Sequence, residues 1–191
     1  TPETTFGPDY TFAIYMHKQL NEPLLIIKTA WGGRNLLQQF RSPSAGPYEQ
    51  DKDRFGNPTG AYYNLIVKRV NDVLADPGKY HPAYDKAAGY EIAGFVWFQG
   101  FNDLVGDYPG GKQDKDYSEY GRLLACFIRD IRKDLKVPQM PFVIGVMGIG
   151  GASVARRRSP TDKAPSPRRS SALTRIPRTS SRMIRSPSIA W

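Results

Sequence analysis

Hydrophobic residues follow helical and strand spacing in alternation along the first 151 residues. In segment 8–21, Phe12, Tyr15, Met16 and Leu20 recur at helical spacing, and Asn21-Glu22-Pro23 is expected to end this helix. Segment 24–30 is a short apolar run between proline and glycine, which predicts a strand buried on both faces. Segments 60–74 and 116–135 repeat the helical spacing, and segments 91–98 and 141–147 repeat the strand pattern. This order of helix and strand indicates an α/β fold with a parallel sheet covered on both sides.

The position of a ligand site follows from this class of fold. Ligands of parallel α/β sheets bind beyond the carboxyl ends of the strands. Here those ends are followed by loops 31–35, 99–111 and 148–153, which are rich in glycine. We therefore expect the functional residues in these three loops.

The composition changes abruptly after Gly151. Residues 1–151 carry 17 Lys/Arg and 17 Asp/Glu, whereas residues 152–191 carry 10 Lys/Arg and one acid, Asp162. The whole net charge of +9 therefore lies in a tail with nine Arg, nine Ser and five Pro. We expect a partial domain at 1–151, and at 152–191 a tail that is either naturally disordered or read in a shifted frame. The shifted frame is favoured, because domains do not normally end in mid-fold.

Several classes of protein are excluded by composition. The chain has no run of eighteen apolar residues, and residues 1–4 do not resemble a signal peptide. Cys126 is the single cysteine, so an internal disulfide or a cysteine-based zinc site is excluded, and we expect it to be buried as a small apolar residue. Because residues 1–151 carry no net charge, we expect the folded part to bind no nucleic acid.

The first candidate site is the sequence Trp31-Gly32-Gly33-Arg34. Paired glycines after a strand allow a ligand to approach the main chain, whose N–H groups can stabilise an oxyanion. A tight turn with Trp31 packed beneath it is the competing interpretation. Trp31 and Arg34 are also candidates for contacts with a sugar.

The second candidate site is the sequence Gln99-Gly100-Phe101-Asn102-Asp103. The amides of Gln99 and Asn102 can each donate a hydrogen bond to an oxyanion without titrating. Asp103 can cap the next segment, bind a loop N–H or orient a donor, and capping is the commonest of these roles.

These motifs resemble those of the SGNH (GDSL-like) hydrolase superfamily. The similar blocks are Trp31-Gly32-Gly33, the segment 94–103 and the segment 141–145. Within the superfamily they are most similar to sialate O-acetylesterase-like and acetylxylan-esterase-like carbohydrate esterases. The resemblance covers roughly residues 5–151, and it implies a three-layer α/β/α sandwich with a parallel sheet, here incomplete.

The resemblance also implies a reaction and roles for residues. Such enzymes remove acetyl groups from sugar hydroxyls with a Ser nucleophile and a His base, and they need no metal or cofactor. By position, Gly32 or Gly33 supplies an oxyanion-hole amide, and Gly100 and Asp103 support the site. Asn102 matches the general superfamily donor, whereas Gln99 matches the donor of the carbohydrate esterases. Phe101 replaces the glutamate usual in that subgroup, so both donors stay open.

Two blocks of the family pattern are absent from this sequence. The Ser-containing first block is not found, because Ser42 and Ser44 lie in a loop and Ser153 begins the tail. The Asp-x-x-His block is missing too, and His17 and His81 match no motif position. We therefore expect an inactive fragment of an esterase, since neither nucleophile nor base is present.

Two other functions are weighed beside the esterase. One is a non-catalytic relic that binds carbohydrate, and the other is binding of nucleic acid or a membrane surface through the basic tail, which salt would weaken. The resemblance implies an acetylated carbohydrate as substrate, no membrane partner, and an extracellular or periplasmic location. The sequence does not predict an oligomeric state.

Overall fold

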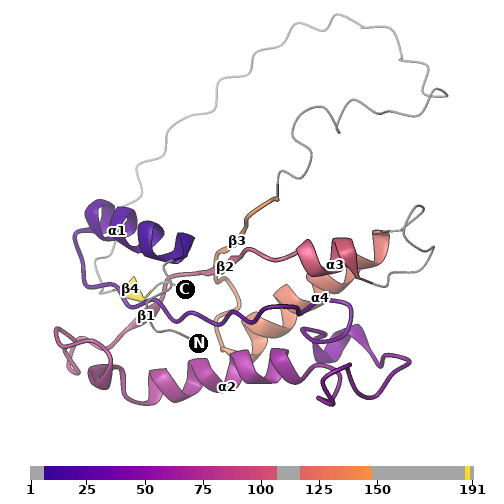
Figure 1. Cartoon of the computed structure of the whole chain (residues 1–191). Helices are drawn as coiled ribbons and strands as arrows, with labels where there is room; N and C mark the ends of the chain where they lie inside the picture. The colour runs from indigo at the N-terminus through magenta and orange to yellow at the C-terminus, as the bar shows by residue number, and fades with distance from the viewer. Residues whose placement is uncertain (1–6, 107–116, 148–187, 190–191) are drawn as a thin grey trace, which may run out of the picture. The chain divides into compact units, whose positions relative to one another are not determined.

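A computed structural model describes residues 7–106, 117–147 and 188–189 (Figure 1). The described elements all belong to one compact unit of the chain. The helices and strands are α1 (Pro8–Leu20), α2 (Ala61–Ala75), β1 (Glu91–Ile92), β2 (Phe95–Trp97), α3 (Phe101–Val105), α4 (Ser118–Asp134), β3 (Phe142–Ile144) and β4 (Ser188–Ile189). Short 3₁₀ turns lie at Pro43–Ala45 and Pro77–Lys79.

The strands pair in parallel, as the alternation of elements predicts. β2 pairs with β3, with Phe95 opposite Phe142 and Trp97 opposite Ile144, and β1 pairs with β4. The strand predicted at 91–98 is divided into β1 and β2. The division falls beside Gly94, where an added Cβ would lie 3.2 Å from the carbonyl oxygen of Pro141. The main chains at Gly94 and Pro141 approach each other closely there, and the pairing of β2 with β3 starts at the next residue.

The structure has no strand at 24–30, so this prediction is wrong. The segment has a single bridge residue, Ile26, and is otherwise outside regular structure. A strand requires a continuous ladder of hydrogen bonds to a neighbour, and apolar composition alone does not supply one. Its burial is also partial, since Ile27 is buried while Leu24 and Leu25 are half-buried.

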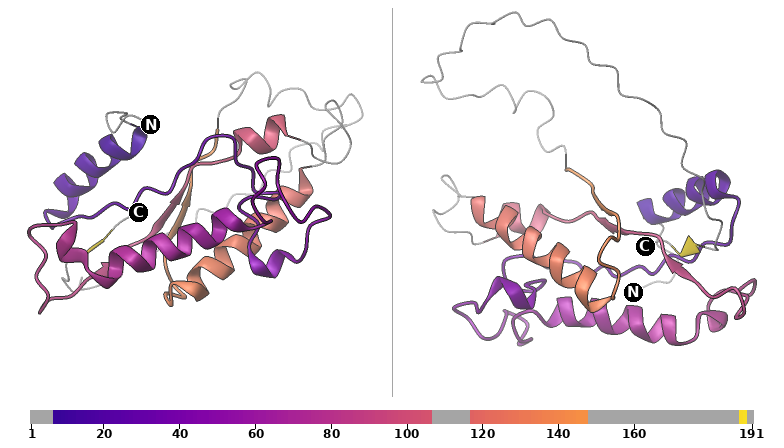
Figure 2. Two further views of the ribbon diagram at one scale, coloured as in Figure 1. Left: turned by 60° about the horizontal axis from the view of Figure 1, so that its bottom comes forward. Right: turned by 180° about the vertical axis from the view of Figure 1, so that it is seen from behind.

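The core lies where α2 and α4 pack beneath the strands (Figure 2). Phe127 of α4 is fully buried and lies against three rings from α2 and β2. Its ring centroid lies 5.4 Å from Tyr63, 5.8 Å from Phe95 and 4.6 Å from Trp97. Edge-to-face and tilted aromatic packing at these distances is favourable beyond the area it buries. The helices predicted at 60–74 and 116–135 are therefore confirmed, and Cys126 is buried as expected.

α1 confirms the helix predicted at 8–21, but it buries no side chain. It lies on the other side of the strands from α2 and α4 (Figures 1 and 2). Asp9 at its start forms an ion pair of 2.8 Å with Lys28. The described residues thus form a mixed helix and parallel-strand fold of the α/β class, in which the core is made by α2, α4 and the strands.

The segment after β2 differs from the loop that the sequence predicts at 99–111. Residues Phe101–Val105 form the short helix α3, which starts directly after Gly100. Residues 107–116 of this loop lie outside the described residues. The whole of the predicted loop at 148–153 lies outside them too. The tail predicted at 152–191 also lies outside them, apart from β4.

Candidate functional site

The buried carboxylate of Asp103 joins the two loops that the sequence singles out. Asp103 is 1% exposed at the start of α3. Its oxygens accept the main-chain N–H of Leu36 at 2.9 Å and that of Leu37 at 3.2 Å. Burying a carboxylate is costly unless hydrogen bonds replace its hydration, and here two main-chain donors do so. Of the roles weighed for Asp103, the described contacts show binding of loop N–H groups.

The turn that receives Asp103 is closed by its own side chains. Asn35 accepts the N–H of Gln38 on Oδ1 at 2.9 Å, and its main-chain N–H donates to Oε1 of Gln39 at 3.0 Å. This reciprocal pair resembles a capping box, in which two side chains satisfy the free donors at the start of a helical turn. The segment directly after Arg34 is therefore held in one conformation.

The side-chain amide of Gln99 is fully occupied. Its Nε2 donates to the carbonyl oxygen of Arg34 at 3.1 Å and also to Oδ2 of Asp103. A primary amide has two N–H donors, and both are used in these bonds. Gln99 therefore connects the end of β2 to the loop after Gly33.

Tyr120, on α4, also belongs to this network. Its hydroxyl accepts the indole N–H of Trp97 at 3.1 Å. The same hydroxyl donates to Gln99, whose main-chain carbonyl oxygen lies at 3.0 Å and whose side-chain Oε1 lies at 3.2 Å. Burial raises the pKa of Tyr120. The hydrogen bond from Trp97 lowers this pKa in part, and the nearby charge of Asp103 raises it further, so that the pKa is raised overall. The hydroxyl thus stays protonated at neutral pH and fixes the Gln99 amide.

Gly100 makes the sharp turn between β2 and α3. Its φ of +155° lies in a region that residues with a side chain rarely adopt, which favours glycine. Asn102 follows on α3 and is half-buried. Its side chain forms no hydrogen bond with another described residue, so its amide donors are unused, in contrast to those of Gln99.

Gly32 and Gly33 lie in a turn on the other loop. The N–H groups of both glycines donate to no other described residue. Gly33 has a φ of +74°, and an added Cβ would lie 3.1 Å from Nη2 of Arg54, whereas the space around Gly32 is open. Main-chain donors are thus available beside the loop that Asp103 and Gln99 hold.

Trp31 packs into the core in the described structure. It is half-buried, and its ring centroid lies 5.3 Å from Tyr62 and 6.3 Å from Phe40. This is the packing role that the sequence leaves open, and a sugar contact of Trp31 stays a prediction.

Arg34 lies beside the glycines, with its guanidinium 3.9 Å from the ring centroid of Phe55 and 4.6 Å from that of Tyr62. Its Nη1 donates to the carbonyl oxygen of Gly32 at 3.0 Å, while its buried Nε has no acceptor among the described residues. Arg34 is therefore held rigidly with hydrogen-bonding capacity that the described residues leave unused.

The histidines and loop serines have no part in this network. His17 is exposed on α1 and contacts the carbonyl oxygen of Glu22, and His81 caps its own loop by accepting the N–H of Ala83. Ser42 directly precedes the 3₁₀ turn that packs on α4, and Ser44 lies within this turn, where its N–H donates to Asp130. None of these four residues is placed as a nucleophile or base beside Asp103.

Within ranges 7–106, 117–147 and 188–189, no group of three or more His, Cys, Asp or Glu side chains is arranged to hold a metal ion. None of the described helices is both long and apolar enough to cross a membrane.

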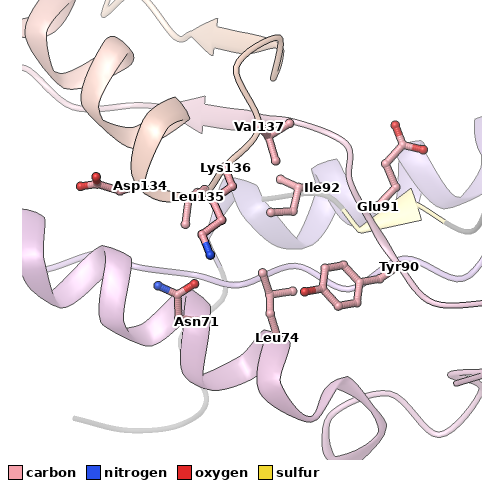
Figure 3. Close-up of a pocket in the computed structure, with 9 residues that line it drawn as sticks. All are labelled: Asn71, Leu74, Tyr90, Glu91, Ile92, Asp134, Leu135, Lys136 and Val137. Atoms are coloured by element: carbon pink, nitrogen blue, oxygen red, sulfur yellow. The ribbon is translucent and has the colours of Figure 1, made fainter.

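A pocket of about 650 Å³ lies away from the network (Figure 3). Asn71 and Leu74 of α2 line it together with residues 90–92 and 134–137. Residues 90–92 precede β2 and residues 134–137 lie at or after the end of α4, whereas Gln99 and Asp103 follow β2. Because ligands of parallel sheets bind beyond the carboxyl ends of the strands, the Asp103 network, and not this pocket, is the candidate site.

Parallel strands with covering helices, and a glycine turn held to the carboxyl end of a strand, are features of the α/β class. The comparison of sequences then names the family. The family described as "Carbohydrate esterase, sialic acid-specific acetylesterase" matches residues 2–172. The chain therefore belongs to this family of carbohydrate esterases, as the motif resemblance predicted. No curated protein and no solved structure gives a significant match.

Sequence reasoning missed Tyr120 and the amides of Leu36 and Leu37. A signal for Tyr120 exists, because Tyr120, Leu123, Leu124 and Phe127 share the i, i+3, i+4, i+7 spacing of a buried face. No sequence pattern marks the amides, since a main-chain donor carries no residue signature.

Proposed function

We propose that this chain carries the oxyanion-binding part of a carbohydrate O-acetylesterase of the sialate O-acetylesterase-like type. Membership of the carbohydrate esterase family supports hydrolysis of acetyl esters on sugars at the level of the family. The finer assignment rests on the network around Asp103, which ties a glycine turn to the end of a parallel strand.

The proposed oxyanion donors are the main-chain N–H groups of Gly32 or Gly33 and the side-chain amide of Asn102. The observation that carries this choice is the occupancy of Gln99: its two N–H donors already bind Arg34 and Asp103. A donor acts on a developing oxyanion when it is preorganised and unoccupied. Gln99 and Asp103, with Gly100, then position the site rather than contact the ester.

The chemistry that these donors support is the stabilisation of a tetrahedral intermediate. In acyl transfer, the carbonyl oxygen of the acetyl group gains negative charge as a nucleophile adds to its carbon, and hydrogen-bond donors lower the free energy of that state. The sequence contains neither the family's Ser block nor its Asp-x-x-His block, so we propose that this chain alone does not turn over. Outside the cell or in the periplasm is the proposed location, by analogy with the family.

Titration of the ¹⁵N-labelled chain with 9-O-acetyl-N-acetylneuraminic acid tests this function. We expect the cross-peaks of Gly32 or Gly33 and of the Asn102 side chain to move, while those of the Gln99 side chain stay. The deacetylated sugar is the matched ligand and should leave the same peaks in place.

Two results would contradict the proposal. Movement of the Gln99 side-chain peak without that of Asn102 would reverse the assignment of donors. Release of acetate by the chain, measured with 4-methylumbelliferyl acetate or the acetylated sugar, would disprove the proposed lack of turnover.

A further inference from the structure

The pocket that lies away from the Asp103 network has an apolar lining (Figure 3). Four aliphatic side chains contribute to it: Leu74 of α2, Ile92 of β1, and Leu135 and Val137 after α4. Ile92 and Leu135 are buried, and the other two are half-buried. Small-molecule sites are cavities of about 300–1,000 Å³ with mainly apolar walls, and this pocket has about 650 Å³. It therefore has the size and the surface to hold the apolar part of a small ligand.

Three charged side chains line the same pocket, and the ion pairs of the described ranges include none of them. The side chains of Glu91 and Lys136 are exposed and form no hydrogen bond with a described residue. Asp134 is half-buried and accepts the Tyr63 hydroxyl on Oδ2 at 2.7 Å, while its Oδ1 has no donor among the described residues. The pocket thus offers two negative charges and one positive charge that the described residues do not neutralise.

Lys136 has a main-chain conformation that is unusual for a lysine. It lies two residues after the end of α4 with a φ of +61°, in the left-handed region. Its N–H donates to the carbonyl oxygen of Lys133 at 3.0 Å, and that of Val137 donates to the carbonyl oxygen of Arg132 at 2.9 Å. Glycine is the usual residue at such a helix end, because a Cβ is strained there. Strained residues are typical of functional sites, so this conformation points to a role for the Lys136 side chain in the pocket.

We propose that this pocket binds an apolar zwitterion, of which an aromatic α-amino acid is the simplest example. The amine of Lys136 and the amide of Asn71 lie on the same side of the pocket in Figure 3, where they bind the carboxylate. Glu91 and Asp134 bind the ammonium group, and the aromatic side chain packs on the aliphatic lining. Each unpaired charge of the pocket then meets an opposite charge on one ligand.

Ligands with a single charge fit this lining less well. A carboxylate alone would meet Lys136 but also the negative charges of Glu91 and Asp134, and an amine alone would leave Lys136 without a partner. An uncharged apolar ligand would displace water from all three groups without replacing its hydrogen bonds, which costs free energy. Residues 90–92 of the pocket precede β2, so the inference does not rest on the function proposed for the Asp103 network.

Calorimetric titration of the full chain with L-phenylalanine measures this binding. Three related compounds each lack one feature: phenethylamine lacks the carboxylate, 3-phenylpropionate lacks the ammonium group and glycine lacks the ring. We expect the first two to bind about threefold more weakly than phenylalanine, because each loses a partly exposed ion pair. Glycine should bind more weakly by about tenfold or more, since it buries no apolar surface.

Variants assign the charges to residues. Lys136→Gly removes the amine and relieves the strained main chain, so the Tm should rise by about 2–4 °C. Phenylalanine should bind to this variant about threefold more weakly, while phenethylamine binds as before. Glu91→Gln should weaken the binding of phenylalanine and phenethylamine but leave that of 3-phenylpropionate unchanged. Lys133→Gln is the matched control, since Lys133 is exposed near the end of α4 and does not line the pocket.

A gain in stability together with a loss of binding cannot come from unfolding, so Lys136→Gly keeps the test valid. No binding of phenylalanine to the folded chain, or equal binding of phenylalanine and its three analogues, would overturn the inference. Equal weakening of phenylalanine and phenethylamine in Lys136→Gly would show that Lys136 does not bind the carboxylate. Competition by 9-O-acetyl-N-acetylneuraminic acid would contradict binding in this pocket, whereas failure of that sugar to bind would count against the proposed function alone.

Discussion

The carboxylate of Asp103 accepts the main-chain N–H of Leu36 at 2.9 Å, although the two residues are 67 positions apart. This contact closes a long loop of chain and holds the glycine turn against the end of β2. It also explains why a side chain at the start of a five-residue helix is almost completely buried.

Asp103→Ala is expected to lower the free energy of unfolding by about 2–4 kcal/mol. The substitution leaves the N–H groups of Leu36 and Leu37 buried without an acceptor, and each such donor costs about 1–3 kcal/mol. Urea denaturation measures the change. Asp51→Ala, at an exposed position, is the matched control and should shift the free energy by less than about 0.5 kcal/mol. Equal effects of the two substitutions would disprove the role of Asp103 in joining the loops.

Tyr120→Phe is expected to remove the acceptor of the Trp97 indole without disturbing the ring packing. The indole N–H of Trp97 donates to this hydroxyl at 3.1 Å, so its proton resonance should move upfield in the variant. Loss of the hydroxyl should also lower the free energy of unfolding by about 1–2 kcal/mol, since a buried donor loses its partner. Tyr80→Phe, on an exposed ring, serves as the control. An unchanged Trp97 resonance would contradict the hydrogen bond.

Two glycine substitutions are expected to act in opposite directions. Gly60 precedes α2 with a φ of +76°, and an added Cβ would lie 2.7 Å from the carbonyl oxygen of Arg41. Gly60→Ala should therefore destabilise the fold by more than about 1 kcal/mol. Gly121 is exposed inside α4 with open space around it, so Gly121→Ala should stabilise by about 0.5–1 kcal/mol. Thermal unfolding followed by circular dichroism distinguishes them, and the same sign for both would refute the argument.

Acidification is expected to destabilise the fold partly through Asp53. Burial raises the pKa of Asp53, but hydrogen bonds from Asn57, Phe55 and Gln39 together outweigh it and leave the pKa below the usual 3.8. A lowered pKa in the folded state means that this stabilisation is complete above about pH 4 and is lost as the pH falls through the folded value.

Urea titrations between pH 6 and pH 2.5 measure this effect. Asp53→Asn should be less stable than the unmodified chain at pH 6, and the difference should shrink as the pH falls. Asp51→Asn provides the neighbouring exposed control. A difference that stays constant with pH would rule out a contribution from the Asp53 charge.

The helices and the family were predictable from the sequence, because both depend on local pattern. Helical spacing placed α1, α2 and α4 correctly, since one buried face repeats every three or four residues. Segment 24–30 was mispredicted because a strand depends on its hydrogen-bonding neighbour, which local composition does not specify. The helix α3 was missed because its five residues are too few to show a period.

The candidate site was predictable only in part. Gln99, Asn102 and Asp103 follow an apolar strand, so their shared position was visible in the sequence. The separate roles of these residues could not be predicted, because they depend on which side-chain amide forms hydrogen bonds with a loop 65 residues away.

The lack of any buried side chain on α1 has a consequence for how the molecule opens. A thirteen-residue helix whose side chains are at most half-buried gains little stability from tertiary packing, and an exposed ion pair such as that of Asp9 with Lys28 adds less than about 1 kcal/mol. The amide protons of α1 should thus exchange with solvent deuterium through frequent local opening, whereas those around Phe127 in α4 should wait for the whole core to open. The chain accordingly has two levels of protection, a labile first helix and a slowly exchanging centre, and trypsin should cut at Lys18 before it cuts within α4.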